Sequence, residues 1–153
     1  MSAETDNLFM GLAIELAHTA YENNEVPVGA VVVQKRNAEI LAAFSNQMRS
    51  TGSSLAHAEM LALQKSMELI KNERLVGCDM YVSLEPCPMC AGAAWASRIG
   101  KVVYGAPSMD AGALGSLLNV GADPRLNYEF PVVGGLLAEE SADLLAKFFS
   151  RHR

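Results

Sequence analysis

The hydrophobic pattern along the chain alternates between helical and strand spacing. In the helical segments apolar residues return every three or four positions, as Leu8, Leu12 and Leu16 do. The strand segments are short runs rich in valine, and the run at residues 26–34 is apolar on both faces, as in a strand covered from both sides. These spacings predict helices over residues 4–23, 56–71, 88–97 and 139–149, and strands over residues 26–34, 39–44, 80–84, 102–104 and 131–133.

Helices that alternate with strands indicate an α/β fold. We expect a three-layer α/β/α sandwich around a mixed central sheet of about five strands. The chain contains no internal repeat or linker, and its 153 residues suit one domain. We therefore expect a single domain over residues 1–153, with residues 46–55 forming a polar loop.

Composition and charge exclude several classes of protein. With 50% hydrophobic and 19% charged residues, the chain can bury a core and does not resemble a disordered protein. The longest apolar runs are strand-sized, so no membrane span is expected. The acidic N-terminal residues do not resemble a secretory signal, and we expect a cytoplasmic protein. The net charge of -5 argues against general electrostatic binding to nucleic acid, although a local basic patch remains compatible with it.

Three residues have the types and spacing of a metal site. Cys87 and Cys90 are three apart at a predicted helix start, so both sulfurs face one side. A helix N-terminus favours the thiolate form that binds metal. With His57, at the start of another predicted helix, they make a three-ligand zinc site with an open fourth position, which is the catalytic pattern.

Glu59 lies two residues after His57, about 200° around an ideal helix. The two residues can serve one site only where the helix begins. Zinc lowers the pKa of its bound water toward about 7, and a nearby carboxylate can carry a proton from that water to a leaving nitrogen. Other interpretations of the motif are a redox pair, a structural zinc site completed by Cys78, and a solvated Glu59.

The combined pattern, His57-x-Glu59 followed by Pro86-Cys87-x-x-Cys90, is the signature of zinc nucleobase deaminases. Nearly the whole chain resembles the bacterial tRNA adenosine deaminases of the cytidine deaminase-like superfamily. The segments that carry the resemblance are residues 25–32, 56–59, 84–93, 97–106, 112–117 and 135–149.

This resemblance implies that His57, Cys87 and Cys90 hold one zinc ion per subunit, that Glu59 transfers protons, and that the protein is a homodimer. It also implies four contacts to the nucleobase, from the Asn46 side chain, the Ala58 backbone and the apolar side chains of Val28 and Leu84. Asn46 has a second interpretation, a loop asparagine that caps its own backbone, and Val28 and Leu84 suit the core equally well.

The function that the resemblance implies is hydrolytic deamination of wobble adenosine to inosine in a tRNA anticodon loop, with an arginine tRNA as the expected partner. Three segments depart from the family. Residues 107–111 read Pro-Ser-Met-Asp-Ala in place of the acidic residue and the lysine that follow at this point in the tRNA-editing members. Residues 53–56 read Ser-Ser-Leu-Ala rather than Asp-Pro-Thr-Ala, and residues 122–128 lack the expected histidines. The alternative is therefore a deaminase of a free base or nucleoside, such as guanine, cytosine or a triazine. A third reading is a non-catalytic, zinc-stabilised partner subunit.

Overall fold

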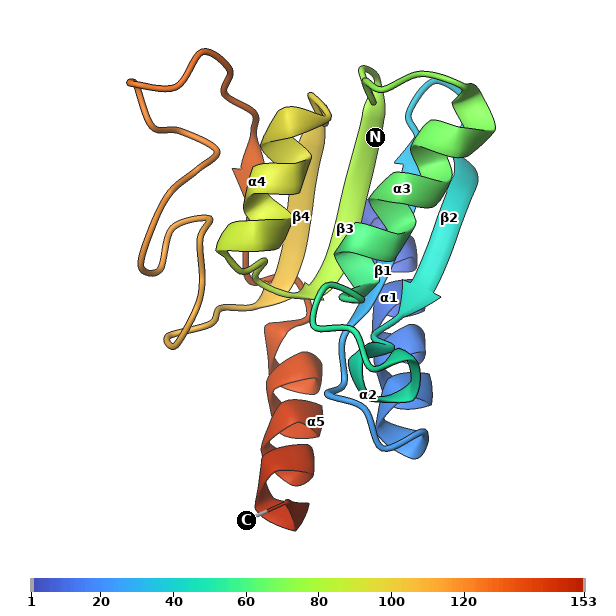
Figure 1. Ribbon diagram of the computed structural model, residues 1–153, viewed down its shortest axis with the longest axis vertical. Helices are drawn as coiled ribbons and strands as arrows, with labels where there is room; N and C mark the ends of the chain where they lie inside the picture. The colour runs from blue at the N-terminus through green and yellow to red at the C-terminus, as the bar shows by residue number, and fades with distance from the viewer. Residues whose placement is uncertain (1, 153) are drawn as a thin grey trace.

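A mixed sheet forms the middle layer of the computed structural model, which describes residues 2–152 (Figure 1). Its five strands are β1 (Gly29–Gln34), β2 (Glu39–Ser45), β3 (Cys78–Leu84), β4 (Lys101–Ala106) and β5 (Val132–Val133). They lie in the order β2-β1-β3-β4-β5. β1 is antiparallel to β2 and β3, whereas β3, β4 and β5 are parallel to one another. The sheet confirms the predicted α/β class.

Helices cover both faces of this sheet. α1 (Ala3–Glu22) and α5 (Ala138–Arg151) pack on one face, and α3 (Ala58–Ile70) and α4 (Pro88–Ala96) lie together on the other (Figure 1). The short α2 (Met48–Thr51) lies in the loop between β2 and α3. The three layers are those expected from the alternating pattern. Among the described residues, no helix has the length and apolar character needed to cross a bilayer.

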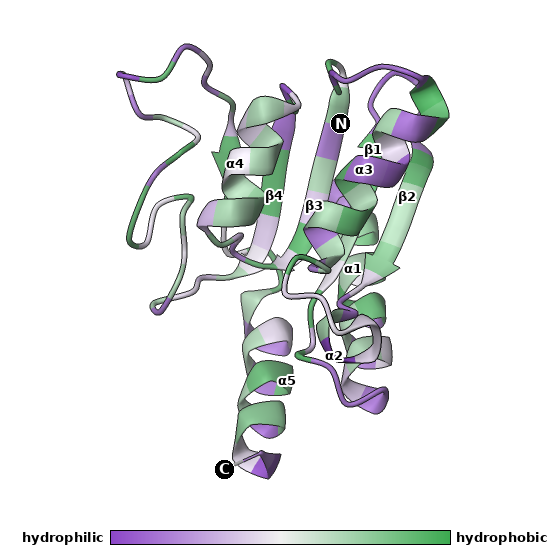
Figure 2. Ribbon diagram, viewed as in Figure 1, coloured by the Kyte–Doolittle hydropathy of each residue, from purple (hydrophilic) through white to green (hydrophobic). Residues whose placement is uncertain are grey.

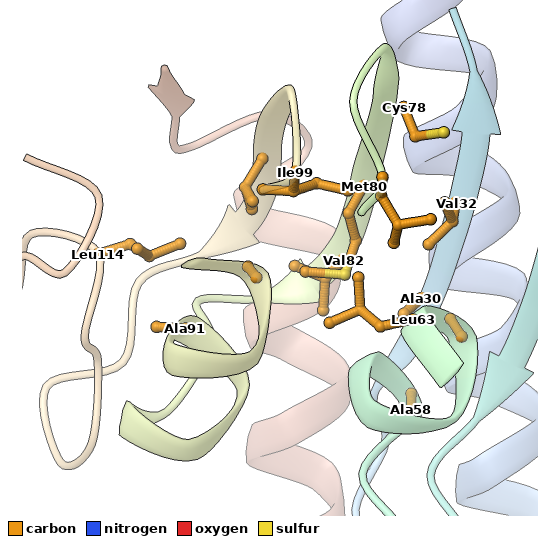
Figure 3. Packing of buried hydrophobic residues seen from close by; sticks show 14 of the residues in the cluster. Ala30, Val32, Ala58, Leu63, Cys78, Met80, Val82, Ala91, Ile99 and Leu114 are labelled. Carbon is orange, nitrogen blue, oxygen red and sulfur yellow. The ribbon is translucent and has the colours of Figure 1, made fainter. Parts of the chain in front are cut away.

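The sheet divides the core into two clusters. The larger cluster lies between the sheet and α3 and α4, where Figure 3 shows Val32, Met80, Val82 and Leu63 pointing toward one another. The smaller cluster lies under α1 and includes Met10, Val31 and Tyr81. β1 faces both clusters, which explains why its sequence is nearly continuously apolar. β3 is also buried on both faces, but its residues alternate between apolar and polar types, and Figure 2 shows purple as well as green along this strand.

α1 packs on β1 at a position where only glycine fits. A Cβ on Gly29 would overlap the Ala13 carbonyl oxygen and lie 2.5 Å from Leu16 Cβ. The helix is capped by Ser2, whose Oγ accepts a hydrogen bond from the Thr5 N–H at 3.2 Å. The close approach lets the small residues of α1 bury against the sheet.

Two strands start two residues or more away from the predicted position. β1 begins at Gly29 rather than at residue 26, because Pro27 has no N–H for the ladder. The Val28 N–H turns back to the Val26 carbonyl at 2.9 Å. β3 begins earlier than predicted, at Cys78, which is buried in the larger cluster.

Two connections also have more order than the sequence suggests. The predicted loop at residues 46–55 contains α2, because the buried Glu25 carboxylate accepts hydrogen bonds from the Arg49 and Ser50 N–H groups, both at 2.8 Å. The long connection from β4 to β5 projects beyond α4 in Figure 1. Its residue Leu114 nevertheless returns to the larger core cluster and is only 4% exposed (Figure 3).

Candidate active site

A cavity of about 250 Å³ opens where α3 and α4 begin, beyond the end of β3. It is lined by His57, Glu59 and Cys87, which are three of the four residues expected to bind zinc or transfer protons. Every residue for which the resemblance implies a nucleobase contact also lines it, namely Val28, Asn46, Ala58 and Leu84. Residues far apart in sequence thus meet in one hollow.

The N-terminal ends of α3 and α4 explain how the residues of the signature reach one site. His57 is the residue just before α3, with extended backbone angles (φ -68°, ψ 147°), so it does not follow the helical rotation that would turn it away from Glu59. Cys87 holds the same position before α4 (φ -73°, ψ 173°), with Pro88 in the first turn. Cys90 follows in that first turn, and both sulfurs face His57.

The three ligand atoms lie close enough to share a metal ion. His57 Nδ1 is 3.7 Å from Cys87 Sγ and 3.4 Å from Cys90 Sγ, and the three atoms all lie within 4.8 Å of one another. Two thiolates and one imidazole are the donor set that zinc prefers, and three protein ligands leave one coordination position open. The residues present therefore fit zinc. Cys78 lies at the other end of β3, which argues against the closed structural site.

The two thiols of the site differ in acidity. A hydrogen bond from Cys90, together with one to His57, lowers the pKa of Cys87 to about 4, although burial acts in the opposite direction. The same contact with Cys87, and burial, raise the pKa of Cys90. The hydrogen bond to Cys87 also raises the pKa of His57. Cys87 is thus the thiolate of the pair, and metal binding displaces the proton that Cys90 keeps.

Glu59 is a buried carboxyl group in this site. Its side chain is 4% exposed, and burial raises its pKa to about 7, against the lowering effect of its own backbone N–H and of His57. A carboxyl group with a pKa near neutrality can both accept and donate a proton at working pH. The burial argues against the interpretation of Glu59 as a solvated helix-start residue.

Asn46 caps its own backbone and also lines the cavity. Its Oδ1 accepts the Met48 N–H at 3.1 Å, and its Nδ2 donates to the Val26 carbonyl at 3.2 Å, as in a backbone cap. The side chain still has a second N–H on Nδ2 and a second lone pair on Oδ1, and it lines the cavity. Val28 is 7% exposed and belongs to the larger core cluster, so its roles in packing and in lining the cavity coincide.

Sequence reasoning missed two buried carboxylates beside the cavity. Glu85 lines it directly, whereas Glu25 holds α2, whose residue Met48 lines it. Each of the two carboxylates is only 2% exposed. The sequence signal that could have found them is a single carboxylate next to an apolar strand segment. Burying an acidic side chain there is costly unless it accepts hydrogen bonds, for example from backbone N–H groups.

Comparison with known proteins identifies the family. The sequence model of the family described as "Cytidine and deoxycytidylate deaminase zinc-binding region" matches residues 3–106, and zinc is therefore the cofactor. The tRNA-specific adenosine deaminase of Bacillus subtilis (strain 168) is 44% identical over 148 residues, 97% of this chain and 91% of the relative.

Two solved structures have the same fold. One, described as "Biochemical and Structural Studies of A-to-I Editing by tRNA:A34 Deaminases at the Wobble Position of Transfer RNA", superposes with a TM-score of 0.84 at 38% identity. It covers 89% of this chain and 97% of its own. The other is a guanine deaminase from Nitrosomonas europaea, with a TM-score of 0.78 at 28% identity over 94% of this chain and 84% of its own. The chain thus belongs to the family of cytidine and deoxycytidylate deaminase zinc-binding proteins.

Proposed function

We propose that this protein is a zinc-dependent hydrolytic deaminase that converts wobble adenosine to inosine in a tRNA anticodon loop. The observation that carries the proposal is the buried Glu59 carboxyl in the same open cavity as His57 and Cys87, whose ligand atoms lie close to that of the buried Cys90. The relative named tRNA-specific adenosine deaminase and the structure described for tRNA:A34 editing support the choice of substrate.

In this mechanism His57, Cys87 and Cys90 hold the zinc ion. Zinc, when bound, supplies a Lewis acid that makes hydroxide available near neutral pH. Glu59 accepts a proton from the water that adds to C6 of adenine. It then donates the proton to the exocyclic nitrogen, the C6–N bond breaks, and ammonia leaves while inosine keeps the new C6–O bond.

The rest of the cavity orients the base. The Asn46 amide and the Ala58 backbone offer hydrogen bonds, while Val28 and Leu84 provide apolar contacts to the ring. Anticodon-loop bases are unpaired, so presenting one of them to the cavity requires little energy.

The assembly that we propose is a homodimer of single-domain subunits, each with one zinc ion, acting in the cytoplasm on an arginine tRNA. α4 supports close subunit approach, because its outer side carries small residues and a Cβ on Gly92 would meet nothing within 4 Å. Sedimentation at micromolar concentration tests the dimer, and a panel of tRNAs tests the arginine preference.

A second candidate function is deamination of a free purine such as guanine. It is favoured by the net charge of -5 and by the similarity to the guanine deaminase of Nitrosomonas europaea. Salt separates the two candidates: RNA turnover at subsaturating substrate falls steeply as salt rises, whereas turnover of a neutral base does not change.

The test of the proposed function is deamination of an arginine-tRNA anticodon stem-loop that carries adenosine at the wobble position. Inosine is read as guanosine after reverse transcription. Glu59→Ala is the control, with zinc content measured in parallel. We expect conversion by the zinc-loaded protein and none by the variant, which keeps its zinc. Ammonia release from guanine without any conversion of RNA would establish the second candidate instead, and equal activity of the variant would contradict the role of Glu59.

A further inference from the structure

Glu85 is a buried carboxylate that the zinc chemistry does not use. It lies between the last residue of β3 and Cys87, and it is 2% exposed. Such a group stays in the core only if hydrogen bonds replace the water it has lost. All four of its hydrogen bonds come from one segment, residues 107–116, which follows β4.

The donors are mostly backbone groups. Glu85 Oε1 accepts the Ser108 N–H at 3.1 Å and the Ser116 hydroxyl. Glu85 Oε2 accepts the N–H groups of Leu114 at 3.0 Å and of Ser116 at 3.1 Å. All four partners are donors, so both carboxyl oxygens of Glu85 act only as acceptors. The segment is therefore folded around one carboxyl group.

Packing restricts the segment in the same way. Gly112 lies directly against the carboxylate, and a Cβ there would be 2.5 Å from both Glu85 oxygens. The Ala113 N–H donates to the Pro86 carbonyl at 2.9 Å, which ties the segment to the start of α4. Leu114 buries its side chain in the larger core cluster. Polar and apolar contacts thus define a single path for residues 107–116.

This path forms part of the cavity that holds the active-site residues. Ser108 and Ala111 line that cavity together with Glu85, Asn46 and Glu59. We propose that Glu85 is a positioning residue that holds residues 107–116 as the substrate-facing side of the cavity, and that it thereby controls substrate affinity. The inference rests on the proposed function, because the segment matters only if a nucleobase enters this cavity.

The chemistry of the contacts explains how this segment can differ from related sequences. Three of the four donors are backbone N–H groups, which every residue except proline supplies. The side chains at residues 108–111 can therefore change while the backbone keeps its path. Glu85 fixes where the segment runs, and the side chains on it decide what the cavity accepts.

Glu85→Gln is the informative substitution because it keeps the size and changes one oxygen into a donor. An amide oxygen can still accept from Leu114 and from the Ser116 N–H, but the amide nitrogen then faces the Ser108 N–H, which is also a donor. The Ser108 N–H therefore loses its acceptor, so the part of the segment that lines the cavity is the first to detach from Glu85. Gly112→Ala tests the same contact from the other side, because the added methyl group displaces the segment from the carboxylate. Glu68→Gln, which removes a charge from a side chain that is 71% exposed, is the matched control.

The experiment measures steady-state deamination of the wobble-adenosine stem-loop, zinc content, and hydrogen exchange of the peptide that covers residues 107–117. For Glu85→Gln and Gly112→Ala we expect KM to rise about tenfold or more, the size typical of a buried N–H that loses its acceptor, while kcat changes less than about threefold. Zinc content stays at the level of the unsubstituted protein. Exchange becomes faster in residues 107–117 and is unchanged in α3, and Glu68→Gln behaves like the unsubstituted protein.

Two results would overturn the proposal. One is unchanged exchange in residues 107–117 together with an unchanged KM in both variants. The other is loss of zinc with a parallel fall in kcat, which would mean that Glu85 acts on the start of α4. Hydrogen exchange needs no substrate, so the contact is tested even if the protein deaminates neither RNA nor a free base. That outcome would contradict the proposed function and the control of affinity while the exchange data still report on Glu85.

Discussion

Lys101 neutralises two carboxylates at the end of the sheet opposite to the zinc site. Its Nζ lies 3.8 Å from Asp79 Oδ2 and 3.7 Å from Asp6 Oδ1. Asp79 is 2% exposed, whereas Lys101 and Asp6 keep about a fifth of their side-chain surface in water. Lys101→Met keeps the length and packing of the side chain but removes the ion-pair partner of the buried Asp79 carboxylate.

The size of the effect follows from the distance. Two unit charges separated by 3.8 Å attract each other by about 4 kcal/mol at an effective dielectric constant of 20. Breaking a buried pair by removing one partner costs about 3–5 kcal/mol, and the partial exposure of Lys101 favours the lower end. We expect Lys101→Met to lower the free energy of unfolding at pH 8 by about 3 kcal/mol.

The loss depends on pH in a defined direction. Burial raises the pKa of Asp79 above its ordinary value of 3.8, and Lys101 and Lys35 oppose this rise. Between 3.8 and the raised pKa the folded state binds more protons than the unfolded state, so stability falls as pH increases through that window. Removing Lys101 raises the pKa further and widens the window. The difference between the variant and the unsubstituted protein therefore shrinks as pH falls from 8 to 5.

Urea denaturation at both pH values measures this difference, and comparison at equal pH removes effects common to both proteins. Adding Asp79→Asn to Lys101→Met removes the unpaired charge and should restore most of the stability at pH 8. A loss below about 1 kcal/mol at pH 8, or a loss independent of pH, would refute the electrostatic reasoning.

Three further outcomes are expected. Leu63→Ala, at a 1% exposed position of the larger core cluster, should lower the free energy of unfolding in urea by about 2–5 kcal/mol, and a similar loss for the 52% exposed Leu69→Ala would contradict the packing argument. Gly29→Ala should destabilise by about 1–3 kcal/mol or more, because its methyl group meets α1. Gly11→Ala, in open space within α1, should stabilise by about 0.5–1 kcal/mol in the same assay, and equal effects at the two glycines would be inconsistent with the close approach. Chelation of zinc should make the partly exposed Cys87 react with a thiol reagent while the buried Cys90 and Cys78 stay protected, and reaction of Cys78 would mean that the fold opens with the metal.

The sequence by itself determined the class of fold and the chemistry of the site. The apolar run at residues 26–34, which includes β1, has no polar face, so it predicted a strand covered on both sides. The spacing of Cys87 and Cys90 predicted sulfurs on one side of a helix start, because that geometry is local. The two-residue spacing of His57 and Glu59 indicated only that both can serve one site if they lie where the helix begins.

Tertiary structure decided whether that condition is met and which other groups form the cavity. His57 and Cys87 come within 3.7 Å because β3 carries the chain from one helix start to the other. Glu25 and Glu85 bind backbone N–H groups of residues about two dozen positions or more away in sequence, and such contacts leave no periodic signal. The short α2 and the path of residues 107–116 therefore depend on buried carboxylates whose partners appear only when the chain is folded. Hydrogen bonds across long sequence separations are decided by packing, and this is the physical reason why the pattern of residues did not reveal them.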